Sequence, residues 1–412
     1  MQPKIYTVDE HRILPEKIDS HAFYVIEKLR EAGHSAYLVG GGVRDLLLGE
    51  KPKDFDVSTS ASPEEIKSLF RNAILIGRRF RLAHIRFGQK IIEVATFRSG
   101  DTEAPDLIVR DNVWGSEEED VLRRDFTING LFYNPREQTV IDYVQGYPDL
   151  EQRILRTIGQ PDLRFIQDPV RMIRLIKFCA RFQFEIDPPT HEALLNCKEE
   201  IVKSSPVRIL EELLRMLESG SARPFFHLLH EYGLLRSLLP ALSSHIEQDS
   251  SQVMMQLLQE IDEGVKQDRK APDRSVLLAA LLFPMMHAHL LQQIEKTGQI
   301  PHLGQIAEQA GKLIDFSFSP FFKLPRKLQG AASFVLASQY RFVPLDGRLR
   351  KPKTVGDPFF SYALDLFKVR CALEPDLLPY YEKWDELPRS FSYEGEEAGL
   401  ARPKRRRRRR RS

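Results

Sequence analysis

The chain has 412 residues, of which 42% are apolar and 29% are charged, a composition typical of a soluble globular protein with two to four packed units. Its net charge of +2 is the sum of two regions of opposite charge. Nine of the twelve residues in 401–412 are Lys or Arg, and the rest of the chain has a net charge of −7. A tail of this kind binds polyanions by releasing counterions, so nucleic acid is the expected partner.

Cysteine usage and the apolar segments exclude several other classes of protein. The three cysteines stand far apart without a CxxC pair, which argues for a reducing compartment and against a zinc site. The first residues, MQPKIYTVDEHRILPEK, contain no apolar core, so we expect no signal peptide. The longest apolar run, residues 275–286, contains a proline and is too short to span a bilayer. We therefore predict a cytoplasmic protein without a membrane partner, in which 275–286 forms a buried helix.

The first third of the chain mixes helical and strand patterns. We expect an amphipathic helix at 21–29. A second helix is expected within 62–70, because Ser62 can cap it and Glu65 follows the cap by three positions. The segment VRDLLLG predicts a short helix that ends at Gly49. Strands are expected at 36–40, 54–60, 81–87 and 91–98.

Beyond residue 147 the strand patterns fade and helical patterns follow one another. Turn residues separate the amphipathic segments from residue 168 onward. Helices are expected at 168–182, 206–219, 223–239, 253–265 and 276–283. We expect His287 and His289 to be core and surface residues rather than cofactor ligands. The predicted architecture is an α+β head with a mixed sheet, an all-helical remainder and a disordered basic tail.

The acidic pair in KDFDV lies on one of the predicted strands. Residues i and i+2 face the same way on a strand, about 6.5–7 Å apart at Cα, so Asp54 and Asp56 can direct two carboxylates to one point. Carboxylates this close repel each other, and Mg²⁺ relieves the repulsion while favouring carboxylate and phosphate oxygens. Two such ions can activate an attacking hydroxyl and stabilise a leaving pyrophosphate. A solvated strand face beside a turn is the alternative interpretation of these two acids taken alone.

Three glycines, Gly40, Gly41 and Gly42, follow an apolar strand and precede the short helix. Without Cβ atoms their backbone can approach a triphosphate closely, and the N–H groups at a helix start favour anions. Arg44 in the first turn can hold phosphate oxygens with two nitrogens. A tight turn explains one or two of the glycines as well, so it is the combination with Asp54 and Asp56 that predicts nucleotidyl transfer.

The stretch LVGGGVRDLLLG…KDFDV resembles the signature of the class II nucleotidyltransferases, which comprise CCA-adding tRNA enzymes and bacterial poly(A) polymerases. RRDFTINGLFY (123–133) and QDPVRMIRLIKF (167–178) resemble a second and a third motif of that family, the third of the form (E)DxxRxxR. All three stand in the family's order across 37–181, and the resemblance is weaker in the helical part. It implies a nucleotidyltransferase head (the catalytic palm) over 17–146, a base-recognising helical neck over 147–218, an all-helical RNA-binding body over 219–400 and a disordered tail over 401–412.

The resemblance makes Asp125 of the second motif the third essential carboxylate, alongside the metal-binding Asp54 and Asp56. Glu93, on a neighbouring predicted strand, can reach the same metal ions. We prefer Asp125 to Glu93 as the third catalytic acid, and the sequence leaves this choice open.

Basic and amide side chains of the second motif are expected around the nucleotide. Arg123 and Arg124 add positive charge beside the metal-bound triphosphate, and Asn129 can hold the ribose or anchor the turn after the motif. The predicted nucleotide-binding residues of the head are Gly41, Gly42, Arg44, Arg123 and Arg124.

The third motif bears on the choice of base. Pro169 suits the first helical position, which places Asp168 at the N-cap. A basic stripe then follows at steps of 3, 3 and 4, opposite an apolar face, at Arg171, Arg174, Lys177 and Arg181. By resemblance, Asp168 and Arg171 hydrogen-bond the base edge of the incoming nucleotide, with Arg174 beside them. Gln167 and Lys177 stand where many relatives have Glu and Arg, which leaves the details of base selection open. A helix cap with a solvated arginine face is the alternative interpretation.

Two basic segments favour one member of the family. Residues 75–85, LIGRRFRLAHI, resemble the pattern of bacterial poly(A) polymerases, whereas CCA-adding relatives usually carry a less basic strand there. The arginine-rich end suits an enzyme that holds many unrelated RNA 3′ ends without reading their sequence, although in a nuclear protein it could be a localisation signal.

The predicted function is therefore a template-independent poly(A) polymerase that uses Mg²⁺ and ATP to add AMP to the 3′ ends of mRNA and other transcripts. We expect it to promote RNA processing and decay, with the RNA-decay machinery as a partner. A CCA-adding tRNA nucleotidyltransferase is one alternative. A non-catalytic RNA-binding adapter is another, disfavoured because the three acids and the base-reading pair are all present.

Overall fold

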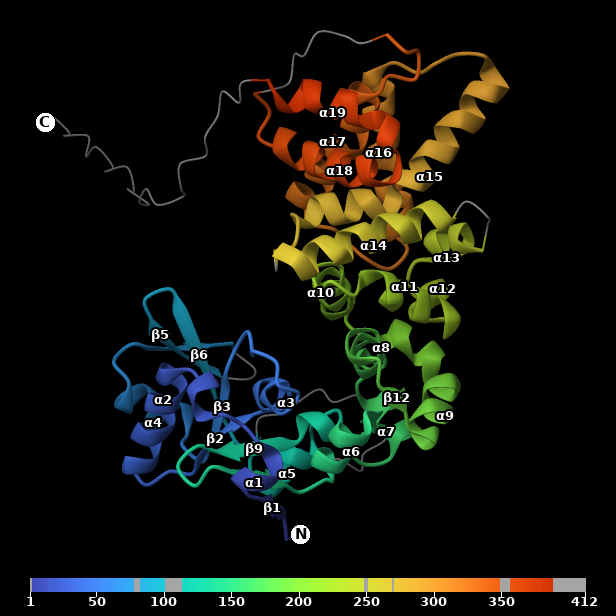
Figure 1. Cartoon of the computed structure of the whole chain (residues 1–412). Helices are drawn as coiled ribbons and strands as arrows, with labels where there is room; N and C mark the ends of the chain where they lie inside the picture. Colours follow the sequence, from blue (N-terminus) through green and yellow to red (C-terminus); the bar gives the residue numbers. More distant parts are fainter. Residues whose placement is uncertain are drawn as a thin grey trace, which may run out of the picture.

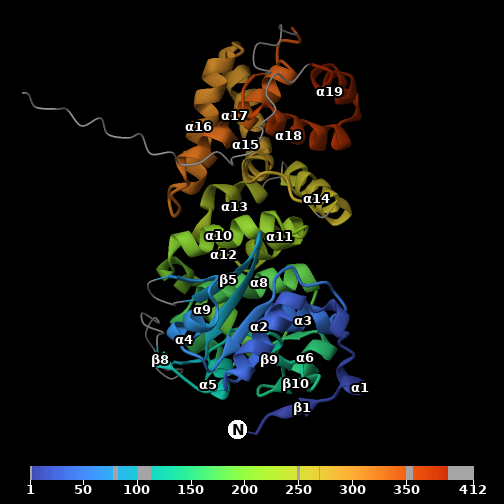
Figure 2. The same ribbon diagram turned by 90° about the vertical axis from the view of Figure 1, so that its left-hand side faces the viewer.

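The computed structural model describes residues 2–77, 82–100, 113–247, 251–268, 270–348 and 356–387. The arginines of the 75–85 stretch (Arg78, Arg79 and Arg81) and the basic tail 401–412 lie outside the described residues. The molecule is elongated, with a head of strands and short helices at one end and the last helices at the other, as Figure 1 and Figure 2 show. The predicted α+β head and helical remainder are confirmed.

The head is built on an eight-stranded mixed sheet with the strand order β1-β10-β9-β2-β3-β6-β5-β4. β3 and β6 run parallel, and the other described neighbours run antiparallel. The strands are β1 Lys4–Tyr6, β2 Ala36–Val39, β3 Asp56–Thr59, β4 Ala73–Ile76, β5 Leu82–Phe87, β6 Lys90–Thr96, β9 Leu131–Asn134 and β10 Thr139–Asp142. A separate pair is formed by β7 Arg98–Ser99 and β8 Val113–Trp114.

Short helices surround this sheet: α1 Val8–His11, α2 Ser20–Glu31, α3 Gly41–Leu47, α4 Pro63–Leu69 and α5 Glu117–Leu122, with 3-10 turns η1 Pro15–Lys17 and η2 Thr127–Asn129. The helix predicted at 21–29 is confirmed as α2, which buries its apolar side against β2 and β3. The predicted cap of α4 is also confirmed, because Ser62 Oγ accepts from the Glu65 N–H and Glu65 Oε2 accepts from the Ser62 N–H.

Helices take over after the last strand of the sheet. They are α6 Gly146–Gln152, α7 Pro161–Gln167, α8 Val170–Phe182, α9 Pro188–Cys197 and α10 Pro206–Leu217, with the 3-10 segment η3 Lys198–Lys203. A small parallel pair, β11 Ile154–Leu155 with β12 Glu185–Ile186, joins the segment before α7 to the segment after α8. This pair is absent from the predicted strands because two residues are too few to show an alternating pattern.

The remaining helices form the far part of the molecule. They are α11 Ala222–Glu231, α12 Leu234–Leu238, α13 Pro240–Ile246, α14 Ser251–Asp268, α15 Arg274–Thr297, α16 Leu303–Phe318, α17 Arg326–Phe342, α18 Phe360–Leu373 and α19 Leu378–Asp385, with η4 Pro375–Leu377. The single helix predicted at 223–239 is wrong, because Gly233 has φ 78° and separates α11 from α12.

Helix α15 contains the apolar run predicted as a buried helix, and that prediction is confirmed. It extends over 24 residues with Pro284 inside it, and it is the one helix in the described part of the chain that is long and apolar enough to cross a membrane. In this structure, 67% of its most apolar window is buried against other parts of the protein.

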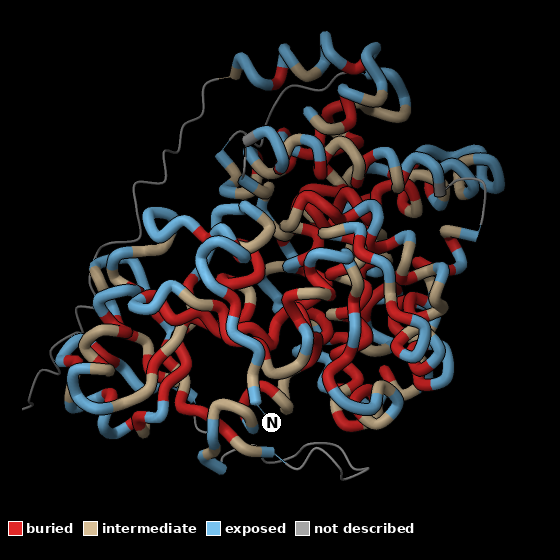
Figure 3. Tube along the Cα trace, turned by 60° about the horizontal axis from the view of Figure 1, so that its bottom comes forward, coloured by how far each residue is buried: buried red, intermediate tan, exposed pale blue. Residues whose placement is uncertain are grey.

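One cluster of buried apolar residues contains members of the head and of the helices, and Figure 3 shows the buried segments in the interior of the molecule. Because alternate residues of a strand face opposite sides of the sheet, Leu38 of β2 joins this main core while Val39 packs with Phe97 and Phe132 in a second cluster. The central strands are therefore covered on both faces, which leaves their ends as the places where polar side chains can gather.

Candidate active site

Acidic side chains meet at one end of β3 and β6. Asp56 is the first residue of β3 and lies opposite Glu93 of β6 in the parallel register. Glu93 Oε1 also lies 3.2 Å from Nε2 of His84 on β5. Asp54 is exposed and precedes β3, so the strand predicted at 54–60 is wrong at its first two positions and at its last. The two aspartates nevertheless remain two residues apart at the same end of the strand.

The surroundings of Asp56 disfavour an isolated carboxylate. Burial raises the pKa of Asp56 to about 6, with the nearby Glu93 and Asp54 adding to the shift and Arg124 opposing it. A bound cation offsets this repulsion, and carboxylate oxygens suit Mg²⁺. Asp54 and Asp56 therefore fit the metal-binding role predicted for them, although no group of three or more His, Cys, Asp or Glu side chains among the described residues is arranged to hold a metal ion.

The three glycines allow a close approach between chain segments. Gly40 has φ +66°, which L side chains rarely adopt, and Gly41 and Gly42 begin α3. A Cβ on Gly42 would lie 3.3 Å from the carbonyl oxygen of Asp54, and one on Gly40 would lie 3.4 Å from Nη1 of Arg124. The glycines thus let α3 lie against the segment that carries Asp54, a structural need that is separate from the predicted contact with a triphosphate.

Arg44 of α3 is 4% exposed and links the head to α8. Its Nη2 donates to Asp45 at 2.6 Å and its Nη1 donates to Oδ1 of Asn129 at 2.6 Å. The guanidinium also lies over the rings of Phe178 and Phe182, 5.1 and 4.7 Å from their centroids. Burial lowers the pKa of Arg44, and Asp45 opposes that shift. Direct binding of phosphate oxygens by Arg44 stays a prediction.

One buried acid, Asp120 of α5, holds both arginines of the second motif. Arg123 Nη2 donates to Oδ1 of Asp120 at 2.7 Å, and Arg124 Nη2 donates to Oδ2 at 2.8 Å. Burial alone would raise the pKa of Asp120, but the two guanidinium groups lower it. Arg124 also lies 5.1 Å from the centroid of Phe132. Asp120 therefore fixes the direction of two side chains predicted to bind the nucleotide.

Asp125 lies among arginines on the cavity lining that it shares with Asp56. Its Oδ2 accepts from Nε of Arg174 at 2.6 Å, and its Oδ1 accepts from Nδ2 of Asn129 at 3.1 Å and from a backbone N–H at 2.9 Å. Burial would raise the pKa of Asp125, but Arg174 and Asn129 hold it below its usual range. Both oxygens are engaged, and the acid that the structure places beside Asp56 is Glu93.

Helix α8 supplies a basic wall, and its predicted apolar face is buried in the core. The side chains of the basic stripe that line the cavity are Arg171, Arg174, Lys177 and Arg181. Arg171 Nη2 donates to the carbonyl oxygen of Arg123 at 2.9 Å, while its Nη1 is buried without a hydrogen-bond partner. Glu212 of α10 accepts from Nζ of Lys177 at 2.6 Å. Arg171 thus lies on the lining with its guanidinium largely buried, and its contact with a nucleotide stays a prediction.

Asp168 lies in the break between α7 and α8. Helix α8 begins at Val170 with Pro169 at its N-cap, one residue later than predicted, and no side-chain cap bond forms. Both carboxylate oxygens of Asp168 instead accept from Nη1 and Nη2 of Arg208 on α10, each at 2.9 Å. The prediction of Asp168 as the N-cap is therefore wrong, and its carboxylate is held over the cavity by a partner 40 residues away.

Gln167, which stands where many relatives have Glu, is buried behind the cavity wall. Its Oε1 accepts from Nη1 of Arg164 at 2.9 Å. Arg164 is 1% exposed, and its Nη2 donates to the carbonyl oxygens of Leu122 and Arg124. Burial lowers the pKa of Arg164 to about 9. Gln167 thus contacts the arginine that holds the backbone of the second motif, and it lies outside the cavity lining.

The side chains of the head and of α8 and α10 surround a cavity of about 480 Å³, within the usual range of small-ligand sites. Eight basic and three acidic side chains line it, an excess of positive charge that suits a triphosphate. The predicted site residues on its lining are Gly41, Arg44, Asp56, Arg124, Asp125, Asp168, Arg171 and Arg174. The predicted residues outside its lining are Asp54, Gly42 and Arg123.

Helix α10 contributes residues that are missing from the predicted site. Arg208 and Arg215 line the cavity, and Glu212 between them holds Lys177. They stand at steps of 4 and 3, the spacing that places residues on one side of a helix. The same spacing rule that predicts the stripe on α8 could therefore have found them, because α10 is itself recognised as an amphipathic helix.

Comparisons with known proteins identify the family of this chain. The family model described as "Poly A polymerase head domain" matches residues 36–156, and "Probable RNA and SrmB- binding site of polymerase A" matches residues 183–246. Poly(A) polymerase I of Salmonella typhi is 36% identical over 382 residues, which cover 89% of this chain and 81% of that relative. This chain belongs to the class II nucleotidyltransferases. The resemblance predicted from the three motifs is confirmed.

Other members of the class II nucleotidyltransferases are similar in sequence and in fold. The CCA-adding enzyme of Lactobacillus delbrueckii subsp. bulgaricus is 37% identical over 214 residues, 51% of this chain and 53% of that relative. The crystal structure of the Bacillus stearothermophilus CCA-adding enzyme in complex with CTP matches with a TM-score of 0.64 at 25% identity, covering 88% of this chain and 80% of that chain. The predicted nucleotidyltransferase fold is confirmed, and the protein is a nucleotidyltransferase enzyme.

Proposed function

We propose that this nucleotidyltransferase is a template-independent poly(A) polymerase that adds AMP from ATP to the 3′ ends of mRNA and other transcripts. The observation that carries this proposal is the extent of similarity along the chain. Poly(A) polymerase I relatives match 89% of it, whereas CCA-adding relatives of comparable sequence identity match about half. Similarity that continues through most of the helical part favours the first activity over the second.

The reaction joins the 3′ oxygen of RNA to the α-phosphorus of ATP and releases pyrophosphate. A divalent cation held by Asp54 and Asp56, with Mg²⁺ as the expected ion and two ions as the expected number, supplies charge stabilisation at the reacting phosphate when bound. Arg124, beside Asp56, and the stripe on α8 orient the triphosphate within the cavity. Positioning of the two substrates provides most of the rate enhancement.

Two side chains read the base in this proposal. Asp168 can accept a hydrogen bond from an amino group, and Arg171 on the same lining can donate one to a ring nitrogen. Adenine and cytosine both present an amino donor beside a ring acceptor, so this pair accepts either base and rejects guanine and uracil. The choice between adenine and cytosine then depends on where Asp168 is held, and Arg208 holds it with two hydrogen bonds.

We infer separate tasks for the two candidate third carboxylates. Glu93 lies beside Asp56 and raises its pKa, which supports Glu93 as the third acid at the metal. Asp125 binds Arg174 and Asn129, which supports a positioning task on the basic wall. This assignment reverses the preference drawn from the motif resemblance.

A nucleotide-preference assay tests the proposed function. ATP and CTP are offered separately to a tRNA that lacks its CCA end and to a generic RNA that ends in A. We expect AMP to be added repeatedly to the generic RNA and no CMP to be incorporated into either substrate. Incorporation of CMP into the tRNA would reverse the choice, and no incorporation at all would favour a non-catalytic RNA-binding adapter.

The second candidate, a CCA-adding enzyme, is favoured by the fold match to the Bacillus stearothermophilus enzyme and by the Lactobacillus relative. RNA as a partner is supported by a structural neighbour, the Thermotoga maritima CCA-adding enzyme complexed with tRNA, with a TM-score of 0.52, 21% identity and coverage of 89% of this chain and 87% of that chain. We also propose that the basic tail 401–412 binds RNA. We further propose that the protein contacts RNA-decay proteins and that it is located in the cytoplasm. The division at 17–146, 147–218 and 219–400 also stays part of the proposal.

A further inference from the structure

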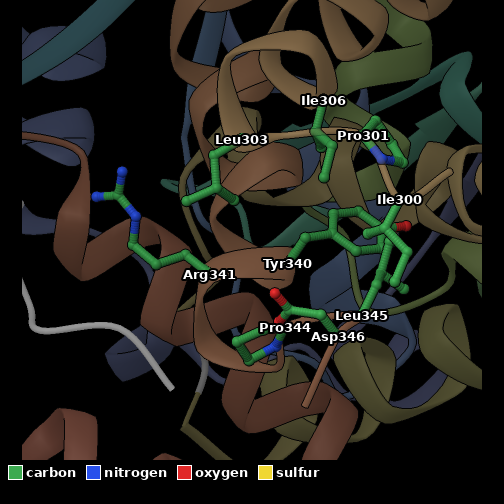
Figure 4. A pocket seen from close by; sticks show the side chains of 9 residues that line it. All are labelled: Ile300, Pro301, Leu303, Ile306, Tyr340, Arg341, Pro344, Leu345 and Asp346. Carbon is green, nitrogen blue, oxygen red and sulfur yellow. The ribbon is translucent and has the colours of Figure 1, made fainter. Parts of the chain in front are cut away.

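The far helices contain a small hollow near the start of α16 and the end of α17, lined mainly by apolar side chains such as Ile300, Leu303 and Leu345 (Figure 4). Its volume of about 30 Å³ has room for a few water molecules and for nothing larger. This hollow is therefore a gap in the packing rather than a ligand site. A contact with more chemistry, which has no task in the proposed reaction so far, lies in the head.

Three polar side chains stand in a row across neighbouring strands of the head. His84 of β5 lies opposite Glu93 of β6, and Glu93 lies opposite Asp56 of β3. Residues that lie directly opposite each other on paired strands point to the same face of a sheet, so the three side chains share one face. The row therefore connects β5 to the acids of the predicted metal site.

Glu93 is held from the β5 side of this row. Its Oε1 lies 3.2 Å from Nε2 of His84, which is its ion-pair partner among the residues that the structure describes. The His84 side chain is 17% exposed, whereas that of Glu93 is 49% exposed. A histidine ring can offer Nε2–H as a donor both in a neutral tautomer and in the charged form. The more buried ring therefore limits the directions in which the more exposed carboxylate can turn.

The position of His84 is itself fixed by the strands around it. Ile74 of β4 lies opposite His84 on the side away from Glu93. Ala83 and Ile85, the residues before and after His84, are fully buried in the main core. Because these two residues anchor β5, the ring between them keeps its place on the other face of the strand. A carboxylate in contact with His84 is positioned by the same packing.

His84 belongs to the stretch 75–85, which resembles the pattern of bacterial poly(A) polymerases. The arginines of that stretch lie outside the described residues, but 82–85 form the start of β5. Strand β5 thus brings the described part of the stretch into contact with Glu93. This contact gives the stretch a physical connection to the predicted metal site.

We propose that His84 is a positioning residue that orients the Glu93 carboxylate toward the divalent cation beside Asp56. Partners of metal-binding side chains fix the direction of these ligands, and removing such a partner typically costs about 10–100-fold in metal affinity or activity. His84 acts through Glu93, which lies between it and Asp56 in the sheet. This inference rests on the proposed function only through the metal-binding task of Asp56 and Glu93.

Binding of Mn²⁺ to the full-length protein tests this role without any AMP transfer. The protein is titrated with Mn²⁺ in the presence of α,β-methylene-ATP, which cannot be cleaved at the bond that the reaction breaks, and the free ion is measured by EPR. We expect His84→Ala to weaken Mn²⁺ binding by about tenfold. The midpoint of thermal unfolding should fall by no more than about 3 °C, because the ion pair is partly exposed. His289→Ala, which removes an exposed ring on α15, is the matched control.

Two further variants separate positioning from packing. Glutamine carries its amide nitrogen the same number of bonds from Cβ as Nε2 of histidine, so His84→Gln should bind Mn²⁺ within about threefold of the wild-type protein. The amide nitrogen of His84→Asn is one bond closer to Cβ, and this variant should bind as weakly as His84→Ala. In a Glu93→Gln background, His84→Ala should cause no further loss, because the carboxylate that it positions is gone.

Three results would overturn the role of His84. They are Mn²⁺ binding by His84→Ala that equals or exceeds that of the wild-type protein, binding by His84→Gln as weak as that of His84→Ala, and an undiminished loss in the Glu93→Gln background. Incorporation of CMP by the wild-type protein, or of no nucleotide, contradicts the proposed function instead. The Mn²⁺ titration decides the role of His84 in either case.

Discussion

The two walls of the head cavity carry opposite charge and differ in how that charge is neutralised. On the strand wall, Asp56 lies beside Glu93 and has a raised pKa. On the helical wall, Arg174 has Asp125 and Lys177 has Glu212 within the protein, while Arg171 donates to the backbone carbonyl of Arg123. These ion pairs organise the helical wall before any ligand binds, whereas on the strand wall Arg124 opposes the raised pKa of Asp56 without cancelling it, and a bound cation would add a further neutralising partner.

The largest expected effect comes from removing a predicted metal ligand on the strand wall. We expect Asp54→Ala to lower the rate of AMP transfer by about a thousandfold or more. Because Asp54 is exposed, the free energy of unfolding should change by less than about 0.5 kcal/mol. Single-turnover extension of RNA and thermal unfolding measure the two quantities. Glu50→Ala, an exposed acid nearby, is the control, and normal extension by Asp54→Ala would show that the assigned metal site is wrong.

The next largest effects come from one substitution on each wall, which should differ in how far they lower the free energy of unfolding. Asp125→Asn leaves Arg174 without its nearest carboxylate, and we expect the free energy of unfolding to fall by about 3 kcal/mol. Glu93→Gln changes a half-exposed side chain, so unfolding should shift by less than about 1 kcal/mol while the rate falls by about a hundredfold. Urea unfolding and initial rates distinguish the two. A stable but inactive Asp125→Asn protein would return Asp125 to the role of catalytic acid.

A smaller effect concerns the choice of nucleotide. Arg208→Ala releases Asp168 from its two hydrogen bonds, and we expect the ratio of kcat/KM for ATP over CTP to fall by about tenfold. The pair is partly exposed, so stability should change by no more than about 1 kcal/mol. Arg215→Ala removes another arginine from the same lining and serves as the control. An unchanged ratio would exclude Arg208 from base selection.

The smallest expected effect comes from changing Gln167, which is buried behind the helical wall. Gln167→Glu places a carboxylate beside Arg164, and we expect a gain of about 1 kcal/mol in the free energy of unfolding at pH 7. The pKa of Arg164 is lowered to about 9, so its charged form destabilises the folded protein below that pH and this penalty fades as pH rises above it. The advantage of the variant should therefore shrink between pH 7 and pH 10 in urea unfolding. A constant difference would show that Arg164 keeps its proton throughout.

Local features of the sequence predict much of this fold because they depend on neighbouring residues. The cap at Ser62, the helix at 21–29 and the basic stripe of α8 each follow from spacing within a few positions. The break at Gly233 and the short β11–β12 pair are missed, because the helical pattern continues across Gly233 and two-residue strands show no period.

The partners of the site residues are harder to predict because they come from distant parts of the chain. Glu93 meets Asp56 through the pairing of two parallel strands, and Arg208 meets Asp168 across 40 residues. The sequence raises Glu93 as an alternative to Asp125 on a neighbouring strand, whereas nothing in its local patterns specifies the pairing of Arg208 with Asp168. The sequence thus identifies which residue types gather at the cavity. The fold determines which acidic side chain pairs with which basic side chain.

The packing of Arg44 has a practical consequence for protein engineering. Its guanidinium belongs to the head but rests on the rings of Phe178 and Phe182 in α8. A chimera that joins this head at residue 146 to the helices of a relative would place Arg44 against foreign side chains. The segment that can be exchanged as a unit therefore extends through Phe182, well past the last strand of the sheet.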